Sequence, residues 1–157
     1  MNLRFKDKGI VEIDDARIIW PNFSGAPTDY NRDGGKPEFN IVIPDDELAQ
    51  ALLDAGWNVK IRPPRDVDEQ PLRTLKIKVG FRGYRPPSIW IVAGENRSKV
   101  TEDTLHRLDK ISIDHVDLDI SPYHSNGHQT AYLQGMVVYK RMDRFEERFA
   151  DEEYPEE

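Results

Sequence analysis

Basic side chains are concentrated in the middle of the chain, where they alternate with apolar ones. Between Trp57 and Lys99 there are ten Lys and Arg but only four Asp and Glu, a net charge of +6. Two stretches here have period two, which places apolar and basic residues on opposite faces of a strand. The expected inward residues are Trp57, Val59, Ile61, Leu75, Ile77, Val79 and Phe81, and the expected outward ones are Asn58, Lys60, Arg62, Thr74, Lys76, Lys78 and Arg82.

Aromatic residues accompany this basic stretch, and the combination suits a single strand of nucleic acid. Cations can follow the repeating phosphates, and flat rings can stack on the bases. We expect phosphate contacts from Lys60, Arg62, Arg73, Lys76, Lys78, Arg82 and Arg85. The candidates for base stacking are Trp20, Tyr30, Phe81, Tyr84 and Trp90, whereas Phe23, Phe39 and Trp57 are expected in the core. The alternative is an ordinary solvated sheet face, because antiparallel sheets often carry Lys and Arg on their wet side.

The C-terminal segment carries the opposite charge. From Glu146 to Glu157 there are seven acids and one Arg, a net of −6, which accounts for most of the formal charge of −7. Like-charged blocks at a terminus are typical of disordered interaction tails. We therefore expect one domain over residues 1–145 and an acidic tail over 146–157, with a purely solubilising tail as the alternative. The tail residues expected to bind partner proteins are Asp151, Glu152, Glu153, Tyr154, Glu156 and Glu157.

Signatures of catalysis and of cofactor binding are few. The absence of Cys excludes cysteine nucleophiles and thiolate zinc sites. His124 and His128 are four residues apart but separated by a turn sequence, and no phosphate-binding or serine-nucleophile motif is present. We expect no enzyme activity, no cofactor and no metal. A hydrolase built on the hairpin of the two His residues is the catalytic alternative.

Length and hydropathy favour one water-exposed domain. The chain has 157 residues and a mean hydropathy of −0.71, which suits a single domain. No apolar run approaches the length that spans a bilayer, and the first residues lack the apolar core of a signal peptide. We expect a cytoplasmic protein without a membrane partner.

Seven segments have the alternation or β-rich composition of strands. They are residues 11–20, 36–43, 57–62, 72–82, 89–92, 111–120 and 129–141. One helix is predicted after Asp45, a plausible N-cap, and before Gly56, and residues 101–108 have room for one or two helical turns. Asn126-Gly127 predicts a tight hairpin turn, and a change of parity near Asp114 predicts a bulge.

This order of elements predicts a mainly β protein. We expect an OB-fold-like small barrel with one short helix and a disordered acidic C-terminal tail. An immunoglobulin-like sandwich is the alternative.

Three segments resemble phage-encoded OB-fold single-stranded DNA-binding proteins, which include a T7-like group. They are residues 16–23, residues 35–44 after a loop with Tyr30, and residues 132–140, followed by the acidic tail. The resemblance implies a protein that coats single-stranded DNA without sequence preference during phage replication, recombination or repair, in the host cytoplasm. It also implies that replication proteins bind the tail.

One feature departs from the T7-like pattern, and two questions stay open. Members of that group end in an aromatic residue, whereas here Tyr154 is followed by Pro155-Glu156-Glu157. The alternative function is a protein-binding or virion structural β-domain without nucleic-acid binding. A homodimer is an alternative to a monomer.

Overall fold

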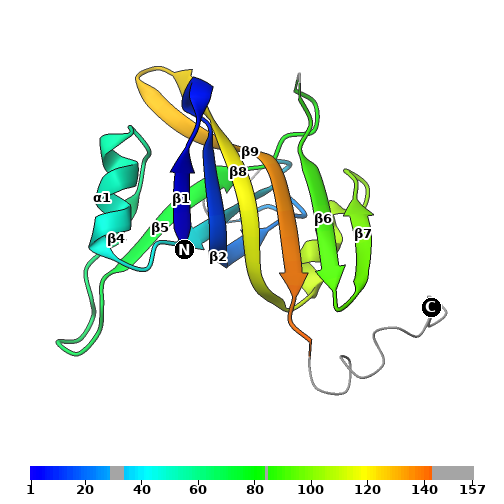
Figure 1. Cartoon of the computed structure of the whole chain (residues 1–157), viewed down its shortest axis with the longest axis horizontal. Coiled ribbons are helices and arrows are strands. Elements are labelled where there is room, and N and C mark those ends of the chain that lie inside the picture. The colour runs from blue at the N-terminus through cyan, green and yellow to red at the C-terminus, as the bar shows by residue number, and fades with distance from the viewer. Residues whose placement is uncertain (29–33, 84, 143–157) are drawn as a thin grey trace.

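The structure is a computed structural model that describes residues 1–28, 34–83 and 85–142 (Figure 1). These residues form a nine-stranded sheet, one α-helix and two short 3-10 helices. The elements are β1 (Asn2–Phe5), η1 (Asp7–Gly9), β2 (Val11–Asn22), β3 (Glu38–Val42), α1 (Asp46–Asp54), β4 (Lys60–Arg62), β5 (Leu72–Lys78), β6 (Ser88–Ala93), β7 (Asn96–Val100), η2 (Leu105–Lys110), β8 (Ile113–Ser125) and β9 (His128–Lys140). None of the helices in these ranges is long and apolar enough to cross a membrane.

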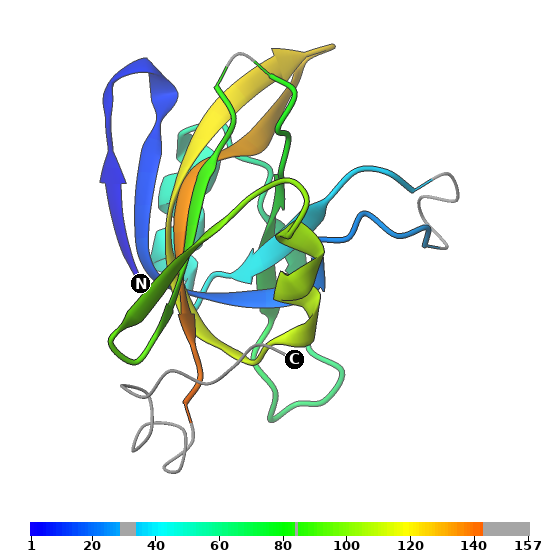
Figure 2. The same cartoon turned by 90° about the vertical axis from the view of Figure 1, so that its right-hand side faces the viewer.

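Five of the strands close into a ring. Strands β5, β3, β2, β8 and β9 follow one another in antiparallel order, and β9 returns to β5 through a short parallel pairing. That pairing aligns Ile77 with Ala131 and Lys78 with Tyr132. Strands β1, β4, β6 and β7 extend the ring at its margins (Figures 1 and 2). The predicted fold class, a mainly β small barrel with one short α-helix, is confirmed, and the sandwich alternative is wrong because the sheet closes on itself.

The interior of the ring is filled by the inward-facing residues of all five strands. Ile13, Ile41, Ile77, Ile120 and Val138 have no measurable exposure, as alternation along each strand requires. The rings of Phe23 and Phe39 stack with centroids 5.1 Å apart, and Trp57 is buried. The prediction of these three aromatic residues as core residues is confirmed.

Helix α1 begins and ends where the sequence predicts. The Asp45 carboxylate accepts a hydrogen bond of 2.8 Å from the Leu48 backbone N–H, which satisfies one of the free donors of the first turn. Gly56 follows the helix with φ of +92°, a conformation that suits Gly. The face of Ala49 and Leu52 packs into the core.

The long hairpin of β8 and β9 has two predicted irregularities. The register shifts between Ile113 and His115, which confirms the bulge near Asp114. Asn126 and Gly127 both have positive φ, which confirms the tight turn. This hairpin reaches beyond the barrel and supplies one wall of the site described below (Figure 2).

Three expectations about the strands are wrong. Strands β1 and β7 were not expected, because the first is short and the second is polar. The predicted strand over residues 72–82 ends at Lys78, after which the chain leaves the sheet. Ile61, expected inward, is half exposed because β4 is a three-residue strand at the end of the sheet order.

Candidate nucleic-acid interface

Two adjoining cavities form a continuous depression where β5 ends and β9 passes it. Their volumes are about 510 and 600 Å³, and both are lined by Gly80, Arg82 and Tyr132. We call the pair the binding groove, with a first and a second lobe. It runs from the segment before β3, across the end of β5, to the side of the β8–β9 hairpin.

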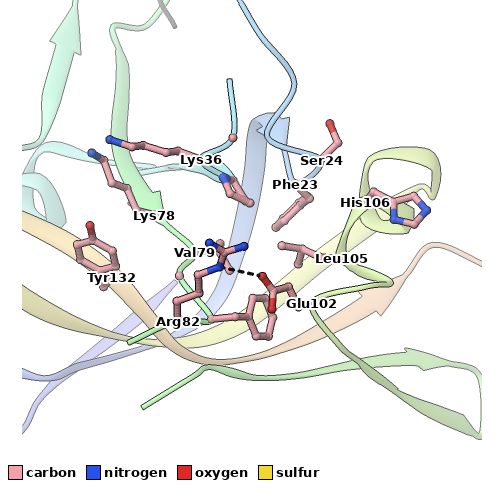
Figure 3. Close-up of a pocket in the computed structure, with 14 residues that line it drawn as sticks. Phe23, Ser24, Lys36, Lys78, Val79, Arg82, Glu102, Leu105, His106 and Tyr132 are labelled. Carbon is pink, nitrogen blue, oxygen red and sulfur yellow. Dashed lines mark ion pairs between the residues drawn. The ribbon is translucent and has the colours of Figure 1, made fainter. Parts of the chain in front are cut away.

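The charged residues that line the first lobe are mostly cations (Figure 3). Lys36, Lys78 and Arg82 line it together with the ring of Phe81. One carboxylate among the lining residues opposes them, because Glu102 Oε1 lies 3.7 Å from Arg82 Nε. Both side chains of this pair are more than half exposed, so the pair is weak and open to exchange with another anion.

The second lobe is lined by two tyrosines and two arginines and has no carboxylate among its described lining residues. Tyr123 and Tyr132 meet edge to face with centroids 5.8 Å apart, and Tyr123 is 58% exposed. Arg85 lines the same lobe. The Gln134 side-chain amide donates a hydrogen bond of 2.7 Å to the Ser121 hydroxyl, which holds the polar floor in place. Accessible rings beside cations are what stacked bases and phosphates require.

Backbone contacts hold the walls of the groove. Val79 N–H donates to the Pro37 carbonyl at 3.0 Å, which joins the segment after β5 to the segment before β3. The Asp109 carboxylate accepts hydrogen bonds of 2.8 Å from the backbone N–H groups of Phe23 and Ser24. The first lobe of the groove is therefore formed by anchored segments, which lowers the ordering cost of binding there.

A cation–π pair lies on the outer face of the barrel. The Arg62 guanidinium carbon is 4.7 Å from the centroid of the Trp20 ring. Thr74, predicted on the outward face, is buried instead, and its hydroxyl accepts a hydrogen bond of 3.3 Å from Arg62. Trp20 has φ of +52°, next to the register shift between β2 and β3. The ring remains about half exposed.

The family described as "Putative phage ssDNA-binding domain" matches residues 3–157 of this sequence. The chain belongs to this family. Its members are DNA-binding proteins rather than enzymes, so the predicted absence of catalysis and the predicted family resemblance are both confirmed. No curated protein matches the chain in sequence.

Solved structures with a similar fold come from a phage single-stranded DNA-binding protein. The protein from bacteriophage Enc34 has a TM-score of 0.54 at 13% identity, over 92% of this chain and 88% of that one. Its complex with ssDNA has a TM-score of 0.56 at 12% identity, over 92% and 93% of the two chains. A C-terminal truncation of the same protein has a TM-score of 0.53 at 13% identity, over 90% and 92%. These similarities show a shared fold.

Apart from Trp90 and Arg73, the predicted site residues of this phage DNA-binding domain fall into three groups. Lys78, Phe81, Arg82 and Arg85 line the binding groove. Trp20, Lys60, Arg62 and Lys76 lie on strands β2, β4 and β5 outside it, and Lys76 Nζ is 3.9 Å from Glu38 Oε1. The remaining predictions, Tyr30, Tyr84 and the tail residues Asp151, Glu152, Glu153, Tyr154, Glu156 and Glu157, lie outside the described residues.

Trp90 is not brought to the groove. It lies on β6, beneath the Arg97 guanidinium at 5.7 Å, and lines neither lobe. Strand β6 pairs with the C-terminal half of β9, from Gly135 to Tyr139. The groove lies beside the earlier part of β9, where Ala131 and Tyr132 pair with β5.

Arg73 is a correction, because its side chain is unavailable to a phosphate. It is 7% exposed, and its Nε donates a hydrogen bond of 2.7 Å to Asp46 Oδ1. A second nitrogen donates to the Pro44 carbonyl at 3.3 Å. A buried guanidinium needs such partners, so Arg73 joins β5 to the start of α1 and has a structural role.

Four groove residues were missed by the sequence reasoning. Lys36 stands in a loop, and Tyr132 and Gln134 share the parity of β9 that faces away from Leu133 and the core. Tyr123 follows the predicted end of its strand. The alternation of β9 could have indicated that Tyr132 and Gln134 point away from the core. It could not indicate that they lie beside β5, because that parallel pairing joins segments about fifty residues apart.

Metal ligation has no support among the described residues. They contain no group of three or more His, Asp or Glu able to hold an ion. His124 and His128 are exposed at the tip of the β8–β9 hairpin.

Proposed function

We propose that this protein binds single-stranded DNA, with little sequence preference, in the binding groove. The observation that carries the proposal is the placement of Lys36, Lys78 and Arg82 beside Tyr132 and Tyr123 in one continuous depression. Cations and aromatic rings line both lobes, and this combination suits a DNA strand whose bases are unstacked. A duplex hides its base faces, so the rings would contribute nothing to duplex binding.

The family membership and the Enc34 complex support this proposal. The outer-face residues Trp20, Lys60, Arg62 and Lys76 would extend the contact area, and Tyr30 and Tyr84 remain candidates for stacking. A protein-binding or virion domain without nucleic-acid contact has less support, because it gives no role to the rings of the second lobe.

The biological setting completes the proposal. The protein would coat single-stranded DNA during phage replication, recombination or repair in the cytoplasm of the infected cell. Residues 1–145 would form the binding domain, as a monomer or a homodimer. The acidic residues 146–157 would recruit replication proteins, which a pull-down with a peptide of residues 146–157 tests directly.

Fluorescence anisotropy with labelled oligonucleotides tests the binding proposal. Four to six neutralised phosphates would give a log–log slope of affinity against salt of roughly −3 to −4. Single-stranded oligonucleotides of different sequence should bind alike and compete better than duplex. Equal affinity for the two forms, or a flat salt response, would overturn the proposal.

A further inference from the structure

A third cavity lies on the other side of the β8–β9 hairpin from the binding groove. Its volume is about 340 Å³, and it opens between the turn joining β1 to β2, the residues that follow α1, and the hairpin itself. In Figure 1 the turn, the tip of the hairpin and the end of α1 lie together at the same corner of the molecule. We call this cavity the hairpin pocket. Its lining includes Phe5, Lys6, Lys8, Trp57, Pro122 and His124.

The chemistry of the hairpin pocket repeats that of the groove. None of its described lining residues is an Asp or a Glu. Phe5 presents half of its surface to solvent, and Lys8 is exposed. Lys6 is a weaker contributor, because its Nζ lies 3.2 Å from Glu12 Oε1. An exposed ring beside an exposed cation suits one nucleotide, with the base on the ring and the phosphate at the ammonium group.

The hairpin pocket adjoins the second lobe of the groove. Both are lined by Pro122. Successive side chains of a strand point to opposite faces. In keeping with this, Tyr123 lines only the groove and His124 lines only the hairpin pocket, whereas Pro122 lies at the boundary and lines both. A single strand of DNA that leaves the second lobe therefore needs only to cross the edge of the β8–β9 hairpin to reach Phe5.

The pocket is held in shape by two close contacts. A Cβ on Gly9 would lie 2.7 Å from Pro122 Cγ, so the β1–β2 turn rests directly against the hairpin, and φ of +77° also favours Gly there. On the opposite side, the Gln129 amide donates to the Ala55 carbonyl at 3.4 Å. The position of the walls is thus set before any ligand binds.

We propose that the hairpin pocket binds a further nucleotide of the same DNA strand, beyond the part held in the groove. Lys8 contacts its phosphate and Phe5 stacks on its base. This inference rests on the proposed function, because it extends the path of the strand from Tyr123 over the hairpin edge. It predicts a footprint longer than the groove alone and assigns a binding role to the N-terminal hairpin.

The test compares binding of oligothymidylates of increasing length to the full chain and its variants. Lys8 has φ of +63°, and Asn tolerates that conformation well, so Lys8→Asn removes the charge without adding backbone strain. Phe5→Leu keeps an apolar side chain but removes the ring. Lys99→Gln is the matched control, because Lys99 is an exposed lysine on β7 that lines none of the three cavities.

We expect the two pocket variants to match the wild type on the shortest oligonucleotides that bind. On longer ones, Phe5→Leu should lose about fivefold or more in affinity, the scale of one stacked base. Lys8→Asn should reduce the salt slope by about 0.7, the scale of one phosphate contact. Lys99→Gln should change neither quantity. A halogenated uracil placed along the long oligonucleotide should photocrosslink to residues 5–9 at one end of the strand only.

The outcomes separate this inference from the proposed function. If Lys78→Ala weakens binding at every length but both pocket variants match the wild type, the inference is wrong and the groove stands. If Lys78→Ala changes nothing, the proposed groove is wrong. If residues 5–9 fail to crosslink at any position of the uracil, the hairpin pocket lies off the strand's path.

Discussion

Cations are found on two sides of this barrel, but their surroundings differ. On the outer face of β1, β2 and β8, which we call the paired face, Arg4 lies 2.7 Å from Asp14 and 3.2 Å from Glu12. In the binding groove, Arg82 lies 3.7 Å from Glu102. Lys36 and Lys78 form no ion pair with any residue that the structure describes. The two regions therefore differ less in the number of cations than in how far those cations are already neutralised.

This difference explains why charge counting is a poor guide to a DNA site. A cation that is paired in the folded protein must give up its carboxylate before it gains a phosphate, so little free energy is left for binding. Ion pairing on the paired face holds the pKa of Glu12 below its usual range, chiefly through hydrogen bonds from Lys6 and then Arg4. In the groove, Lys36 and Lys78 have no ion pair to break among the described residues, so their charge is available to a phosphate.

The largest expected effect comes from removing two groove cations together. Lys78→Ala with Arg82→Ala should weaken binding to single-stranded DNA on the order of 100-fold, if each contributes a charge-assisted hydrogen bond of about 1.5 kcal/mol. The salt slope should become shallower by about 1.4. Salt-dependent anisotropy measures both quantities.

Lys76→Ala is the matched control for that double variant. Lys76 is on the same strand and face as Lys78, but it is paired with Glu38 and lies outside the groove. Its loss should cost less than fivefold in affinity, and thermal unfolding should be unchanged in both proteins. An equal loss from Lys76→Ala would mean that DNA follows the outer face instead of the groove.

The sequence predicted the local features of this fold because their causes are local. The N-cap Asp45 accepts its hydrogen bond from a backbone N–H only three residues away. The tight turn at Asn126-Gly127 depends only on the ability of these two residues to adopt positive φ. Arg73 shows the opposite case. It has the parity of the buried residues Leu75 and Ile77, but its partner Asp46 is 27 residues away. Arg73 was therefore predicted as a surface cation, because the carboxylate that stabilises it in the interior is distant in the sequence.

The same reasoning explains which site residues were found. Lys78 and Arg82 were predicted because alternation over residues 72–82 points them outward, but only Lys78 lies on β5, and Arg82 reaches the groove from the segment after the strand. Tyr132 was missed because it becomes part of a site only where β9 meets β5, and that contact consists of two residue pairs. Trp90 was included on composition, but its strand joins the barrel at the other end of β9.

The next effect concerns the rings. Tyr132 lines both lobes of the groove. Tyr132→Leu should therefore make the free energy of DNA binding less favourable by about 1–3 kcal/mol, the usual contribution of one stacked base. Tyr132→Phe should retain most of the affinity, since the π face remains. Trp90→Leu is the comparison, with no expected change in binding. If Trp90→Leu weakens binding more than Tyr132→Leu does, the β6–β7 hairpin belongs to the interface.

A smaller effect, with the opposite sign, should come from the carboxylate of the groove. Glu102→Gln frees Arg82 from its exposed partner and removes a negative charge from the path of the phosphates. Affinity should rise by about two- to fivefold at low salt, within the range of an exposed ion pair, and the gain should vanish as salt increases. Asp14→Asn on the paired face should leave affinity unchanged, because its partner Arg4 lines none of the three cavities. A gain from both variants would indicate long-range repulsion by net charge.

The smallest expected effect lies within the paired face and concerns stability. Burial raises the pKa of Asp119, with a further contribution from Glu12, directly opposite on β2, and from Asp14. An acid whose pKa is raised on folding makes the native state less stable when it is ionised, and this penalty disappears as pH falls through the raised pKa. Asp119→Asn should therefore increase the stability at neutral pH, by less than about 0.5 kcal/mol because the side chain is largely solvated. Thermal unfolding across a pH series should show the difference between variant and wild type closing in acid. A variant that is less stable than the wild type at neutral pH would mean that ionised Asp119 is stabilised by Arg4 and Lys6, and that the paired face has no excess of negative charge at this position.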